Sequence, residues 1–262
     1  MYQKLSKSRI GTFARLGRRR FREETGLFMA EGHKCVSDTI GSFSLEALVA
    51  TEQWLAAHAD SLSAVAQDCV WSAAPRDMER ISQLATAPDV IAVYRLPDWS
   101  RGEVPTPQEG ELCIALDDVQ DPGNLGTIVR AADWFGVRRI YASSGTADVF
   151  GSKAVQATMG AISRVRVYYC DLPELLSGSS LPRFGTLLDG DNLYEATFSG
   201  REGILVFGNE GKGLSTEVRQ LVTDRLLIPP YPAVGEHPES LNVGVAAAVT
   251  LAEFRRRAAQ KI

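Results

Sequence analysis

The chain has 262 residues, 45% of them hydrophobic and 23% charged, and a net charge of −4. This length corresponds to about two domains, and the composition is that of a globular protein with a buried core. The absence of an apolar run of about 18 residues excludes a membrane-spanning helix. The basic N-terminus lacks an apolar segment, so we expect no secretory signal there.

Positive charge is concentrated at the N-terminus. Residues 1–22 contain eight basic residues and no acidic one, whereas the other 240 residues hold 20 Lys and Arg against 32 Asp and Glu, a net of −12. The eight are Lys4, Lys7, Arg9, Arg15, Arg18, Arg19, Arg20 and Arg22. Such a segment is either a phosphate-binding surface or a solvated helix face, and the sequence leaves both interpretations open.

Cysteine and histidine residues are widely separated along the chain. Cys35, Cys69, Cys113 and Cys170 form no CxxC pair, and His33, His58 and His237 are equally dispersed. This pattern argues against a disulfide framework and against a zinc site. We therefore expect reduced thiols, a cytoplasmic protein and no bound metal.

The first part of the chain alternates strand-like and helix-like segments. Strands are expected at residues 27–32, 45–51, 69–74 and 89–96, with a helix from about His33. The alternation predicts a small α/β domain over residues 1–96. Residues 97–110 contain three prolines and two glycines, which is typical of a linker.

The second part of the chain repeats the alternation over residues 111–262. Expected strands are 112–119, 138–144, 164–169, 184–190, 203–208 and 225–230, and a long helix is expected at 240–260. Strands separated by helices predict a mostly parallel sheet with helices on its faces.

The stretch "DDVQDPGN", residues 117–124, follows a predicted strand and precedes an amphipathic helix. Ligands of open parallel sheets bind outside the carboxyl ends of the strands, where this loop lies. Asn124 is a candidate N-cap of the helix, and Gly136 is a candidate C-terminal stop. Arg130 lies opposite the apolar stripe. Taken alone, this stretch favours a capping role for Asn124 and a solvated Arg130.

Two further stretches combine flexible backbone with polar side chains. "LVFGNEGKGLS", residues 205–215, has three glycines within six positions, which permits close backbone approach to a ligand, and Glu210 sits in this turn. It matches neither GxGxxG nor the P-loop pattern. In "RLLIPPYPAVGEHPESLNVGVAAAV", residues 225–249, Ser240 or Asn242 could cap the closing helix.

In their order and spacing, the three stretches resemble motifs one, two and three of the SpoU (TrmH-type) RNA 2′-O-ribose methyltransferases of the SPOUT superfamily. The segment "RRRFREETGLFMAEGHKCVSD" is similar to the opening of the N-terminal RNA-binding domain of many members. The resemblance implies an S-adenosylmethionine-dependent enzyme that acts on rRNA or tRNA. It also implies a homodimer and a C-terminal domain with a deep trefoil knot, a topology that general folding rules would reject.

The resemblance assigns roles to individual residues. It implies a cofactor site at Gly208, Ile228 and Leu241, and an active site at Asn124, Arg130, Glu210, Ser240 and Asn242. Arg130 would reach toward cofactor held by the partner chain. Since a permanently charged guanidinium is a poor general base, we expect Arg130 to stabilise developing negative charge and to bind a phosphate.

Two alternatives stay open at this point. One is an RNA-binding protein that kept the fold and lost catalysis, and the other is a methyltransferase that acts on a base. The stretch between Ile228 and Ser240 is also longer than the common family spacing, which leaves the cofactor contacts there open.

Overall fold

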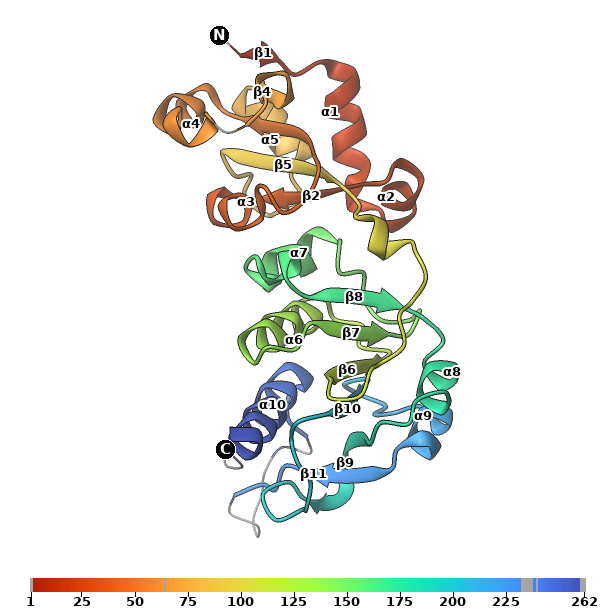
Figure 1. Ribbon diagram of the computed structural model, residues 1–262. Helices are drawn as coiled ribbons and strands as arrows, with labels where there is room; N and C mark the ends of the chain where they lie inside the picture. Colours follow the sequence, from red (N-terminus) through yellow and green to blue (C-terminus); the bar gives the residue numbers. More distant parts are fainter. Residues whose placement is uncertain (1, 64, 232–237, 239, 260–262) are drawn as a thin grey trace. The chain divides into compact units, whose positions relative to one another are not determined.

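The computed structural model describes residues 2–63, 65–231, 238 and 240–259. The chain packs into two compact units (Figure 1). The first comprises Met1–Asp98 together with Asp148–Ser163, and the second comprises Trp99–Ala147 together with Arg164–Ile262.

The first unit is built on a five-stranded mixed sheet in the order β1–β4–β3–β5–β2. Its strands are β1 (Gln3–Lys4), β2 (Leu27–Glu31), β3 (Leu45–Ala50), β4 (Val70–Ser72) and β5 (Val90–Arg95). Its α-helices are α1 (Lys7–Ala14), α2 (Arg19–Thr25), α3 (His33–Thr39), α4 (Glu52–Ala57), α5 (Pro75–Ile81) and α7 (Ser152–Thr158). Strand β5 runs antiparallel to both β2 and β3, while β1, β3 and β4 are mutually parallel.

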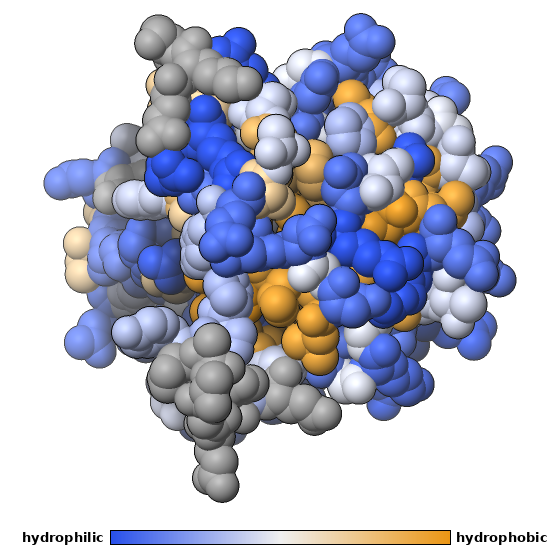
Figure 2. Space-filling view, turned by 90° about the horizontal axis from the view of Figure 1, so that it is seen from below, coloured by the Kyte–Doolittle hydropathy of each residue, from blue (hydrophilic) through white to orange (hydrophobic). Residues whose placement is uncertain are grey.

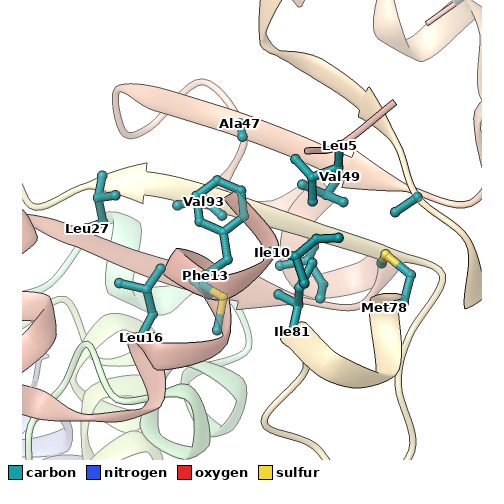
Figure 3. Close-up of a cluster of buried hydrophobic side chains, with 13 residues drawn as sticks. Leu5, Ile10, Phe13, Leu16, Leu27, Ala47, Val49, Met78, Ile81 and Val93 are labelled. Carbon is teal, nitrogen blue, oxygen red and sulfur yellow. The ribbon is translucent and has the colours of Figure 1, made fainter. Parts of the chain in front are cut away.

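One face of this sheet forms the core shown in Figure 3. Because side chains alternate across a strand, Val49 and Val93 point to the same face, where Phe13 of α1 and Ile81 of α5 cover them. Helix α1 therefore belongs to the core. The basic segment therefore contributes buried side chains as well as positive charge.

The opposite face of the sheet is covered in part by residues 148–163. Phe150 packs against Phe28 of β2, with ring centroids 4.9 Å apart. Arg22 forms a buried ion pair with Asp148 at 2.5 Å, and Ser152 donates a hydrogen bond to the buried Glu31. A segment that follows β7 in the sequence thus belongs by packing to the first unit. The domain limits expected from the sequence, 1–96 and 111–262, stay a prediction.

The second unit contains a six-stranded sheet, all of whose pairings are parallel, in the order β11–β9–β10–β6–β7–β8. The strands are β6 (Leu112–Asp117), β7 (Arg139–Ala142), β8 (Arg166–Tyr169), β9 (Arg183–Asn192), β10 (Gly203–Gly208) and β11 (Asp224–Leu227). The helices are α6 (Pro122–Trp134), α8 (Leu172–Ser177), α9 (Thr216–Leu221) and α10 (Val243–Ala259). Figure 1 shows α6 and α10 on one face and α8 and α9 on the other.

These elements confirm the expected α/β class and the mostly parallel second sheet. Strand β10 coincides with the predicted 203–208, and the apolar stripe of α6 is buried at Leu125, Ile128, Val129 and Ala132. The long closing helix is α10, which begins at Val243 rather than at residue 240. Figure 2 shows the second unit from the side of β9 and β11, where hydrophobic residues are exposed among hydrophilic ones.

Candidate active site

The candidate site lies where β6 and β10 end side by side. The two strands are paired in parallel, with Asp117 opposite Gly208, so both run out at the same edge of the sheet. From β6 the chain proceeds outward through β7 and β8, and it later returns to the other side of β6 as β10. The strand order therefore reverses between these two strands, which is where open α/β sheets bind their ligands.

Gly208 is required by the tight turn that follows β10. A Cβ atom at this position would lie 2.4 Å from the backbone carbon of Gly213. Asn209 and Gly213 exchange backbone hydrogen bonds of 3.0 and 2.9 Å, and the Oδ1 of Asn209 accepts from the N–H groups of Gly211 and Lys212. The predicted close approach at Gly208 is therefore made first of all with its own loop, which carries Glu210 at its tip.

The loop after β6 is joined to the loop after β10 by residues that sequence analysis did not select. Asp117 is buried and accepts a hydrogen bond of 2.7 Å from the backbone N–H of Ser215. The backbone oxygen of Asp118 accepts a hydrogen bond of 2.9 Å from the side-chain amide of Asn209. Asp118 has a φ of +61°, a conformation that few non-glycine residues adopt. The signal available in the sequence is a pair of acidic residues, Asp117 and Asp118, at the end of a buried strand.

The start of α6 differs from the expectation. Asp121, not Asn124, is the N-cap, and its carboxylate accepts from the backbone N–H of Asn124 at 2.8 Å. Pro122 occupies the first helical turn, where a missing N–H costs nothing. The prediction that Asn124 caps this helix was wrong. Its side chain instead donates to the Oε1 of Glu210 at 2.8 Å.

Asn242 completes a chain of side-chain hydrogen bonds with Asn124 and Glu210. It donates through Nδ2 to the Oδ1 of Asn124 at 2.8 Å. Its own Oδ1 accepts from the N–H groups of Gly244 and Val245, at 3.0 and 3.3 Å, so it also caps α10. The three motifs of the sequence thus meet in one hydrogen-bonded relay, Asn242–Asn124–Glu210.

The orientation of both amides in this relay follows from its two ends. An ionised Glu210 can only accept, so Asn124 must turn its NH₂ toward it and its oxygen toward Asn242. The backbone N–H groups of α10 can only donate, so Asn242 must turn its oxygen toward them and its NH₂ toward Asn124. Both requirements are met together.

The other expected site residues lie outside this relay. Arg130 is on the exposed face of α6 and has no hydrogen bond or ion pair within the described part of the chain. Ser240 is exposed as well, without a hydrogen bond to another described residue. Leu241 is 51% exposed beside Asn242, and Ile228 is half-buried directly after β11. Most of the longer stretch between Ile228 and Ser240, at 232–237 and 239, lies outside the described residues.

Four of the eight basic residues in the N-terminal segment are paired with acidic residues within the first unit. Arg22 is buried with Asp148, Arg19 and Arg20 bond Glu23 and Glu24, and Arg9 lies 3.6 Å from Glu46. Part of the expected phosphate-binding charge is therefore structural, because a buried ion pair such as that of Arg22 is held in place by its own partner.

The four cysteines are free. Among residues 2–63, 65–231, 238 and 240–259, no helix is both long and apolar enough to cross a bilayer. No group of three His, Cys, Asp or Glu side chains suited to a metal ion occurs in that described part.

Two family models match the chain. The model of the SpoU rRNA Methylase family covers residues 111–252, and that of the MRM3-like substrate binding domain covers residues 7–92. The 23S rRNA (guanosine(2553)-2′-O)-methyltransferase of Bacillus subtilis is 26% identical over 252 residues, which is 94% of this chain and 96% of that protein.

Solved structures of similar proteins match over nearly the whole chain. A protein from Porphyromonas gingivalis assigned to the TrmH family of RNA methyltransferases is 39% identical, with a TM-score of 0.83 over 97% of this chain and 99% of that one. The SpoU methyltransferase AviRb from Streptomyces viridochromogenes, solved in complex with the cofactor AdoMet, is 25% identical. Its TM-score is 0.82, over 96% of this chain and 98% of that one.

Proposed function

The chain belongs to the SpoU rRNA methylase family, and from this premise we propose that it transfers a methyl group from S-adenosylmethionine to a ribose 2′-hydroxyl of RNA. The observation that carries the proposal is the Asn242–Asn124–Glu210 relay, which joins the three motifs at the carboxyl ends of β6 and β10. The Bacillus subtilis relative is named for 2′-O-methylation of 23S rRNA. That name favours rRNA as the first substrate pool to test, ahead of tRNA.

The proposed cofactor site consists of Gly208, Ile228 and Leu241. S-adenosylmethionine combines an adenine ring with a methylated sulfonium, and it supplies an electrophilic methyl group when bound. The half-buried Ile228 and the half-exposed Leu241 offer apolar surface of the kind that receives an aromatic ring. Gly208 adds no side chain at the end of β10 and permits the tight turn to Gly213, which shapes the backbone of the proposed site. These residue types fit the cofactor.

Arg130 is proposed to act on the ribose and its phosphate. Its guanidinium is a permanent cation with five N–H donors and no acceptor. It therefore suits the stabilisation of a developing 2′-alkoxide and the gripping of the adjacent phosphate rather than proton abstraction. The exposed position of Arg130 on α6, with no protein partner in the described residues, leaves the guanidinium available for this role.

The relay and Ser240 are proposed to position the substrate. In Asn124 and in Asn242, both the amide nitrogen and the amide oxygen form hydrogen bonds, which holds the two side chains rigidly at the start of α6 and α10. Rigid polar groups that orient a reacting hydroxyl can contribute several kcal/mol to catalysis. Ser240, exposed two residues before Asn242, offers a hydroxyl beside the relay.

A homodimer is part of the proposal. Trp134 is 83% exposed, one helical turn after Arg130 on α6. A large exposed indole is typical of an interface, and burial of Trp134 against a second copy would bring Arg130 toward the partner's cofactor. The change Trp134→Arg is expected to give a monomer in multi-angle light scattering and to abolish turnover. A dimer of unchanged mass, at concentrations near those of the assay, would contradict this arrangement.

The C-terminal trefoil knot and a cytoplasmic location are further parts of the proposal. The knot is supported by the family resemblance of the stretch from β10 to α10, and the location by the free cysteines.

The decisive experiment uses tritiated S-adenosylmethionine with rRNA and tRNA from the host, followed by digestion to nucleosides. A labelled 2′-O-methylated nucleoside is the expected product. A labelled base-methylated nucleoside would instead indicate the alternative target atom. Measurable cofactor binding with no label in any RNA pool would favour an RNA-binding protein that has lost catalysis, a reading that the named relatives do not favour.

A further inference from the structure

The rings of His33, Trp54 and His58 lie together on the first unit. In the sequence, all three are far from the candidate active-site residues. The ring centroids of Trp54 and His58 lie 4.2 Å apart, with planes inclined by only 14°. His33 packs beside this pair, 4.7 Å from His58 and 5.9 Å from Trp54. The two histidines are 25 residues apart in the sequence and were expected to be dispersed, but the fold places them in contact.

The sheet explains why these residues meet. Strands β2 and β3 both run antiparallel to β5, which lies between them, so their carboxyl ends lie at the same edge. His33 is the first residue of α3, which follows β2, and Trp54 lies in α4, which follows β3. Figure 1 shows α3 and α4 at this end of the sheet. Trp54 and His58 are four residues apart and therefore share one face of the helix.

The cluster is not part of the hydrophobic core. His33 is exposed, and Trp54 and His58 are half-buried. The indole Nε1 of Trp54 is shielded from solvent and has no hydrogen-bond partner within the described residues. A shielded N–H without a partner costs about 1–3 kcal/mol, so packing alone does not account for an indole at this position.

One ring nitrogen of the cluster already has a hydrogen-bond partner. The Nδ1 of His58 lies 2.8 Å from the backbone oxygen of Trp54. Because a carbonyl oxygen only accepts, His58 carries a proton on Nδ1 and donates it there. That bond fixes the plane of the imidazole against the indole, so the pair is a rigid support for the exposed His33.

We propose that His33, supported by Trp54 and His58, is a stacking platform for an unpaired base of the RNA substrate. Proteins that bind single-stranded RNA stack its bases on aromatic and histidine rings, and this is sequence-tolerant because every base has a π-face. The region lies within the match to a substrate binding domain. The proposal rests on the proposed function in that the substrate is RNA, and it specifies which surface of the first unit receives a base.

The test compares two ligands of equal charge. Binding of the full-length protein is measured by fluorescence anisotropy with an oligouridylate of about 12 nucleotides, within the site sizes of single-strand binders. The second ligand is the matching abasic ribose-phosphate oligomer. The wild type is expected to prefer the ligand that carries bases, and His33→Ala is expected to reduce that preference about 10-fold, within the range for one stacked base.

Two further variants separate stacking from charge. His33→Phe keeps a planar ring and is expected to retain the preference for bases, whereas His33→Lys keeps a cation and is expected to lose it. The slope of binding against salt should stay unchanged in His33→Ala, because no phosphate contact is removed. As a folding control, circular dichroism and calorimetric titration with S-adenosylmethionine should match the wild type for every variant.

The proposal is overturned if the wild type binds both ligands equally, or if His33→Lys retains the preference that His33→Phe loses. Neither result bears on methyl transfer, which the labelling experiment tests independently. Conversely, a failure of label transfer with an intact preference for bases would sink the proposed function and leave the platform standing.

Discussion

Replacement of Glu253 by Gln should loosen the docking of α10, whose opposite end carries Asn242. Glu253 is only 6% exposed and receives hydrogen bonds of 2.7 Å from Arg256 and 2.6 Å from Arg257. Arg257 in turn donates to the backbone oxygens of Leu193 and Ala196. The carboxylate therefore holds in place the arginine that ties α10 to the loop after β9.

The magnitude follows from the pKa of the carboxyl group. The hydrogen bonds from Arg256, together with those from Arg257, lower the pKa of Glu253 from 4.5 to about 2. A depressed pKa in the folded state stabilises the protein above the unfolded value of 4.5, and this stability is lost as the pH falls toward 2. At 1.36 kcal/mol per pKa unit, the ionised group contributes about 3 kcal/mol at neutral pH.

Urea unfolding of the full-length protein, followed by tryptophan fluorescence, is the assay. Glu253→Gln is expected to lower the free energy of unfolding by about 3 kcal/mol at pH 7, and this deficit should shrink as the pH falls below 4.5. Glu195→Gln is the matched control, since Glu195 is exposed and the same change there should cost less than about 0.5 kcal/mol. Equal losses in the two variants, or a deficit that does not vary with pH, would refute the reasoning.

Three further changes test the candidate site directly. Gly208→Ala would place a Cβ 2.4 Å from the Gly213 backbone, so calorimetry should show loss of S-adenosylmethionine binding. Wild-type affinity for the cofactor would show that binding does not need this turn. Asn242→Asp keeps a good N-cap but cannot donate to Asn124, so kcat/KM should fall about 10-fold with helicity unchanged. A fall in helicity would mean that the capping of α10 matters more than the hydrogen bond to Asn124. Arg130→Ala should abolish turnover while calorimetry still detects cofactor binding; parallel loss of both would refute its proposed role.

The structural elements that depend on local rules could be predicted from the sequence. Strand β10 and the buried stripe of α6 follow from periodicity, which depends only on neighbouring residues. The N-cap of α6 was also within reach of a local rule. Asp121 precedes Pro122, and proline favours the first helical position, so the cap belongs one residue before it. Asn124 competes with Asp121 in the sequence because asparagine and aspartate suit an N-cap equally well.

Long-range partners could not be predicted from local patterns. Arg22 read as one of eight basic residues, yet its partner Asp148 is 126 residues away. The packing of residues 148–163 onto the first sheet is not predictable for the same reason, since their helical pattern resembles that of any crossover between parallel strands. Asp117 and Asn209 read as ordinary loop residues, because the bonds that give them a role cross from one motif to another.

The relay explains why asparagine stands at both 124 and 242. Position 124 must donate to a carboxylate and accept from an amide, and position 242 must donate to Asn124 while it accepts from the backbone of α10. An ionised aspartate could accept at either place but could not donate, whereas an amide supplies both functions from one planar group. Only Asn242 also caps its helix, because Asp121 caps α6. Only the pair, joined end to end with Glu210, requires the amide at both positions, so the residue types at the start of α6 and of α10 are chemically interdependent.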